Sequence, residues 1–151
     1  MNNLASEPKL KTKLITWLLE GDVAIQYQVY RDLLSSERPD LQNRIALEGW
    51  GKRFLSKRRP DGHWGLKFYQ PKWTSSHYTI LDIRNLCIDP EHPLLKESVN
   101  RIADQEKGVD GGINPSKQFA SDVCINGMFL NYASYFKIPE NNLKSVVDKL
   151  Q

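Results

Sequence analysis

The chain has 151 residues, of which 40% are hydrophobic and 26% charged, a balance typical of one folded domain rather than of a disordered segment. Its net charge of +3, from 21 basic and 18 acidic residues, is too mild to indicate a nucleic-acid-binding surface. We expect a cytoplasmic protein with reduced thiols, because there are only two cysteines, no apolar run long enough for a membrane span, and no signal-peptide core in residues 1–13.

Helical periodicity runs along most of the sequence, and no segment is predicted to form a strand. Seven helices are expected, over about residues 10–20, 23–35, 39–59, 76–88, 93–107, 121–136 and 142–150. Turn and cap residues separate them, for example Gly21 followed by Asp22, and the Pro60-Asp61-Gly62 turn. Gly127 falls inside the sixth predicted helix, and we attribute it to a close approach between two helices. The predicted fold class is all-α.

Part of the sequence repeats. Asp61-Gly62 returns 49 residues later as Asp110-Gly111, and Pro90 returns at the same spacing as Pro139. Each unit consists of a helix, an Asp-Gly turn, a short extended piece, a second helix and a proline turn. A fixed period of this length indicates stacked helix pairs, each of which needs its neighbours to bury its apolar face. We therefore expect the helices at 76–88 and 121–136 to be equivalent and to pack side by side.

One turn carries a family resemblance. The segment Arg59-Pro60-Asp61-Gly62-His63-Trp64-Gly65 resembles the Asp-Gly-x-Trp-Gly turn of the repeat found in squalene cyclases and protein prenyltransferases. The segment at 110–113 resembles a second such turn. The segments at 76–79 and 123–128 resemble the starts of inner helices in that superfamily. The resemblance covers about residues 40–150, and residues 18–34 resemble the helical lead-in of bacterial prenyltransferase-like proteins.

This resemblance implies an α/α toroid, in which helical hairpins surround a central cavity. A closed toroid needs about five to seven hairpins, and this chain holds roughly two and a half, so the resemblance implies a partial toroid. We expect a single all-helical domain over residues 1–151, with a lead-in over 1–38 and the repeats over 39–151. In this arrangement Trp64 is expected to be buried at a hairpin junction, whereas Ile113 replaces the Trp of the second turn.

Three residues are candidates for a metal site. His77, Asp122 and Cys124 lie near the starts of the two equivalent helices, and their side chains are acceptable zinc ligands. The resemblance adds that protein prenyltransferases bind zinc through Asp, Cys and His, with an Asp-x-Cys spacing that Asp122 and Cys124 share. The alternative is structural: Asp122 caps its helix, His77 lines a turn and Cys124 belongs to the core.

Two functions follow as hypotheses. By resemblance, the chain is a prenyltransferase- or terpene-cyclase-like repeat protein that binds an apolar or isoprenoid-like small molecule in a cavity, with no reaction assigned. The alternative is a non-enzymatic helical repeat domain that binds a partner protein. In either case an incomplete set of repeats leaves an apolar edge, which a second copy or a partner is expected to cover.

Overall fold

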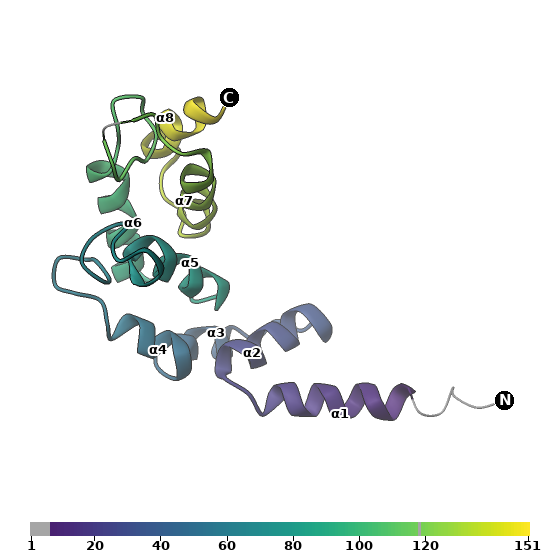
Figure 1. Cartoon of the computed structure of the whole chain (residues 1–151). Coiled ribbons are helices and arrows are strands. Elements are labelled where there is room, and N and C mark those ends of the chain that lie inside the picture. The colour runs from purple at the N-terminus through teal and green to yellow at the C-terminus, as the bar shows by residue number, and fades with distance from the viewer. Residues whose placement is uncertain (1–6, 118) are drawn as a thin grey trace. The chain divides into compact units, whose positions relative to one another are not determined.

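The computed structural model describes residues 7–117 and 119–151, without the side chains of residues 7–10. The described chain is helical, as predicted, and its only strand-like pairings are the isolated bridges Lys67–Gln70 and Lys107–Ile113. Its helices, shown in Figure 1, are α1 (Glu7–Leu19), α2 (Val23–Gln28), α3 (Pro39–Ile45), α4 (Gly49–Leu55), α5 (Ser76–Asn85), α6 (Pro93–Gln105), α7 (Val123–Tyr135) and α8 (Glu140–Leu150). A π-helical turn (Val29–Leu33) extends α2, and a 3-10 turn (Lys72–Thr74) precedes α5. None of these helices is both long and apolar enough to cross a membrane.

The prediction of one continuous helix over about residues 39–59 is wrong, because the chain forms two helices there, α3 and α4. The break follows from Asp22, whose carboxylate accepts hydrogen bonds from the backbone N–H of Ala24 in α2 and of Trp50 in α4, each at 2.9 Å. Gly49 makes this approach feasible with a left-handed φ of +59°, and a Cβ there would collide with the Asp22 carboxylate. The Asp22 side chain therefore caps both helices. The apolar periodicity across residues 46–48 gives no indication that the helix is broken there.

The described chain divides into two compact units. The first, residues 1–55 with 86–89, holds α1 to α4, and α2 packs against α1, α3 and α4 within it. The second, residues 56–85 with 90–151, holds α5 to α8. The boundary between these units lies near residue 56. The single domain over 1–151, with its lead-in over 1–38 and repeats over 39–151, stays a prediction.

The second unit contains the predicted pair of equivalent helices. α5 packs against α7, as predicted from the repeat, while α8 packs against both α7 and α6 (Figure 1). Its core consists of fully or almost fully buried aliphatic and aromatic side chains from all four helices and the two turns, including Ile80, Ile83, Leu95, Val99, Ile102, Ile113, Phe129, Tyr132, Phe136 and Val146. The toroidal arrangement itself stays a prediction.

Candidate functional site

The two Asp-Gly turns have the same backbone geometry. Gly62 and Gly111 adopt left-handed φ values of +83° and +82°, which favour glycine. In the first turn the Asp61 carboxylate accepts a hydrogen bond from the N–H of His63, at 3.1 Å. In the second, the Asp110 carboxylate accepts one from the N–H of Gly112, at 3.3 Å. The two Asp-Gly dipeptides that are 49 residues apart therefore share a backbone conformation as well as a sequence.

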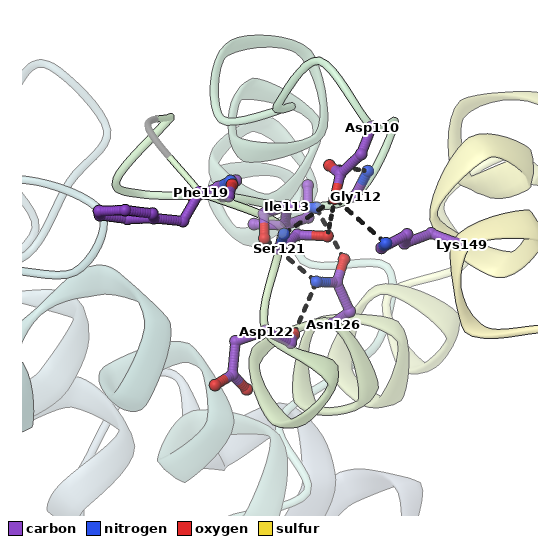
Figure 2. Close-up of polar contacts among 9 residues, drawn as sticks. Asp110, Gly112, Ile113, Phe119, Ser121, Asp122, Asn126 and Lys149 are labelled. Atoms are coloured by element: carbon purple, nitrogen blue, oxygen red, sulfur yellow. Dashed lines mark hydrogen bonds and ion pairs between the residues drawn. The ribbon is translucent and has the colours of Figure 1, made fainter.

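Each turn is fastened to the helix that follows it. Ser76, the first residue of α5, accepts a hydrogen bond from the N–H of Trp64 at 3.0 Å. In α7 the buried Asn126 accepts from the N–H of Ile113 at 2.7 Å and donates to the Ile113 carbonyl at 3.1 Å. Figure 2 shows Asn126 between this backbone and the start of α7. Trp64 is only 2% exposed, as predicted, and Ile113 is fully buried at the equivalent place.

Asp110 links the second turn to the last helix. Its carboxylate accepts hydrogen bonds from the N–H and hydroxyl of Ser121, at 2.8 and 2.9 Å, and pairs with the Lys149 ammonium of α8 at 3.3 Å (Figure 2). The bonds from Ser121 lower the pKa of Asp110 to about 2, with help from Lys149. These contacts hold the ends of the segment between the second turn and α7, which forms one wall of the cleft described below.

The three metal candidates have separate environments. Asp122 is the N-cap of α7 and accepts hydrogen bonds from the N–H groups of Cys124 and Ile125, at 2.7 and 3.2 Å. Figure 2 shows its carboxylate pointing away from the Asp110 network. Cys124 is exposed rather than in the core, whereas His77 is fully buried.

Within residues 7–117 and 119–151, no three His, Cys, Asp or Glu side chains are grouped so that they could hold a metal ion. We therefore do not propose zinc at His77, Asp122 and Cys124. The physical reason is that the Asp122 carboxylate serves its own helix end, while the His77 ring lies among buried aromatic side chains.

His77 is surrounded by aromatic rings. The ring centroids of Phe68, Tyr69, Tyr78 and Tyr132 lie 5.1 to 5.7 Å from that of the imidazole. Its Nδ1 is 3.2 Å from the Tyr132 hydroxyl, and its buried Nε2 has no hydrogen-bond partner among the described residues. Burial lowers the pKa of His77 to about 4, so the imidazole is neutral at neutral pH.

The aromatic cluster continues to the surface. The Tyr69 and Tyr78 hydroxyls are 3.1 Å apart, and the Trp73 ring, which is 71% exposed, lies 4.9 Å from the Tyr78 ring. Burial and the bond to Tyr78 raise the pKa of Tyr69 to about 12, with a smaller contribution from the Asp122 carboxylate. The Asp122 carboxylate at the start of α7 therefore has a weak electrostatic effect on this cluster.

A cleft of about 420 Å³ opens beside this cluster. It is bounded by the short hairpin before α5 and by the segment after the second turn, and it is lined by Lys67, Phe68, Tyr69, Gln70, Glu106, Pro115 and Ser116. Two equivalent loops of the repeat thus face one another across it. The Glu106 carboxylate also acts electrostatically on Tyr132, whose pKa is raised well above its usual value mainly by burial.

Sequence reasoning selected His77 only as a metal candidate and missed the residues that line the cleft. The available signal was aromatic: Phe68, Tyr69, Trp73 and Tyr78 fall within eleven residues. Helical periodicity does not identify such residues, because they lie in a hairpin, in the 3-10 turn and in the first turn of α5. A comparison with family models, curated proteins and solved structures finds no match to this chain.

Proposed function

We propose that the second unit binds an apolar, isoprenoid-like small molecule in the cleft between its two repeat loops. The observation that supports this is the partly exposed ring of Tyr69, which lines the cleft beside the buried Phe68 and packs on the buried His77. A volume of about 420 Å³ falls within the range of about 300–1,000 Å³ that is usual for small-molecule sites. The family resemblance of the two turns favours an isoprenoid-like ligand, and the proposed activity is binding.

The walls of the cleft are suited to a ligand with an apolar body and one polar end. Aromatic faces gain free energy by removing apolar surface from water, and their rigid side chains lose little entropy in doing so. Lys67 and Glu106 supply one positive and one negative group on the same lining. A hydroxyl can donate to the carboxylate or accept from the ammonium, so a prenyl alcohol meets both requirements.

The test is calorimetric titration with farnesol as the probe, below the concentration at which farnesol aggregates. We expect saturable binding, and at least a tenfold loss of affinity in Tyr69→Ala, which removes one aromatic wall. Trp50→Ala is the matched control, because it removes an exposed ring from the other unit. Equal affinities for wild type and Tyr69→Ala would contradict the proposal.

The first unit favours a second function, the non-enzymatic binding of a partner protein. In α1, Leu14 is 51% and Trp17 66% exposed, and Trp17, Leu18 and Ile25 line an open hollow of about 470 Å³. Large exposed apolar side chains that lie together are typical of interaction sites. A tagged chain and its Trp17→Glu variant, compared by co-purification and mass spectrometry, test this: a partner retained by the wild type alone supports it, and identical profiles contradict it.

A further inference from the structure

The sequence of the last helix resembles that of α6 and is identical at three of nine aligned positions. Residues Leu94-Leu95-Lys96-Glu97-Ser98-Val99-Asn100-Arg101-Ile102 align with Asn142-Leu143-Lys144-Ser145-Val146-Val147-Asp148-Lys149-Leu150, at a spacing of 48 residues. The aligned positions share the Leu-Lys pair, a valine and an aliphatic residue at the end. Equivalent positions in a repeat are expected to have equivalent surroundings wherever a neighbouring unit is present.

The surroundings of two aligned positions differ. Val99 and Ile102 of α6 are 0% and 1% exposed, and α8 packs against their helix. Their counterparts Val147 and Leu150 in α8 are 39% and 37% exposed. Val147 and Leu150 therefore form a partly exposed apolar stripe on α8, at positions whose counterparts in α6 are buried.

This stripe borders a groove of about 500 Å³ between α7 and α8. Apolar side chains line it, Leu130 from α7 and Leu143 with Val147 from α8. Its charged lining includes Lys144 and Asp148, which form an exposed ion pair at 2.9 Å within α8. An ion pair this exposed contributes little to folding, so its partners can be exchanged at low cost.

We infer that the α7–α8 groove is the interface of a homodimer, in which α8 packs antiparallel against α8 of a second copy. In an antiparallel pair centred near Val146, Lys144 of one copy opposes Asp148 of the other, and the reverse pair forms by symmetry. A two-fold interface has to be self-complementary in this way. Val147 of each copy then lies between the two charged pairs and is covered, whereas Leu150 lies just outside them.

The contact follows one helix of 11 residues, and it is smaller than the roughly 800 Å² per partner of a standard stable interface. The expected dimer is therefore weak, and dissociation should be visible at micromolar concentrations. Sedimentation velocity of the full chain over a wide concentration range should show a monomer–dimer equilibrium. Val147→Glu should abolish it, whereas Lys57→Glu, a charge reversal at an exposed site outside the groove, should leave it unchanged.

A charge exchange tests the antiparallel register. Lys144→Glu alone places four negative groups at the interface, and Asp148→Lys alone places four positive ones, so each variant should be monomeric. Mixed in equal amounts, they should form a heterodimer, because each acidic pair then opposes a basic pair. Circular dichroism checks that every variant is folded. A monomeric wild type at millimolar concentration, or singly substituted chains that fail to combine, would overturn the inference.

Discussion

Asn126 holds both backbone groups of Ile113, accepting from its N–H at 2.7 Å and donating to its carbonyl at 3.1 Å. Asn126 also donates to the Asp122 carbonyl at 2.8 Å, so its amide nitrogen serves two acceptors. In the first turn Ser76 has the corresponding role for Trp64 through a hydroxyl. The two turns therefore share a geometry but differ in the side chain that fixes them, an amide in one and a hydroxyl in the other.

Asn126→Asp tests this difference. The substitution preserves shape but replaces the donating nitrogen with a charged oxygen that faces two carbonyl oxygens in a fully buried place. We expect a loss of roughly 3–5 kcal/mol in the free energy of unfolding, as for an uncompensated buried charge. Ser76→Ala should cost less, about 1–3 kcal/mol, since it leaves neutral groups without a partner and buries no charge. Urea denaturation measures both, and equal losses would contradict the ranking.

Trp64→Ala tests the packing of the first turn. The indole is 2% exposed, and its removal from the core should lower the free energy of unfolding by roughly 3–5 kcal/mol. The matched control is Trp73→Ala, because Trp73 is 71% exposed in the same unit and should cost little. Thermal unfolding followed by circular dichroism provides the comparison, and an unchanged midpoint for Trp64→Ala would refute the packing role.

The parts of the fold that depend on local periodicity could be predicted from the sequence. The helices from α5 to α8, the buried Trp64 and the packing of α5 against α7 all follow from apolar spacing, turn residues and the repeat. The break between α3 and α4 could not be predicted in this way, since it depends on Asp22, which lies 28 residues from Trp50. The cleft was missed for the same reason: its walls come from two loops that are brought together by tertiary packing.

Gly127→Ala tests a position where the structure contradicts the prediction from the sequence. Gly127 was expected at a close helix–helix approach, but a Cβ added there meets nothing within 4 Å. Alanine in the middle of α7 should therefore stabilise the protein by about 0.5–1 kcal/mol through helix propensity and the lower entropy of the unfolded chain. Differential scanning calorimetry measures the change. Gly111→Ala is the contrasting variant and should destabilise, because Gly111 has a left-handed φ of +82°.

The buried imidazole of His77 predicts a specific pH dependence. Its pKa is about 4 in the folded protein against 6.5 for an exposed histidine, so the unfolded state binds more protons between these values. Stability should be fully present above about pH 6.5 and should fall as the pH falls towards 4, by roughly 3 kcal/mol from this residue. Urea denaturation at pH 7, 6, 5 and 4 measures the decline.

The variant His77→Gln assigns that decline to this side chain. Glutamine keeps a polar group beside the Tyr132 hydroxyl but has no proton to gain, so the free energy of unfolding should change much less between pH 7 and 4. Some decline should persist, because burial also lowers the pKa of His63. His63→Gln is therefore the comparison, and its effect should be smaller, since His63 is only half-buried. Asp110 and Glu91, whose pKa values are about 2 in the folded protein against 3.8 and 4.5 as ordinary values, begin to lose their stabilising charge at the lower end of this range, so they add to the decline near pH 4 in the wild type and in the variant alike. If His77→Gln and the wild type lose stability in parallel from pH 7 to 4, the buried neutral imidazole is not the cause.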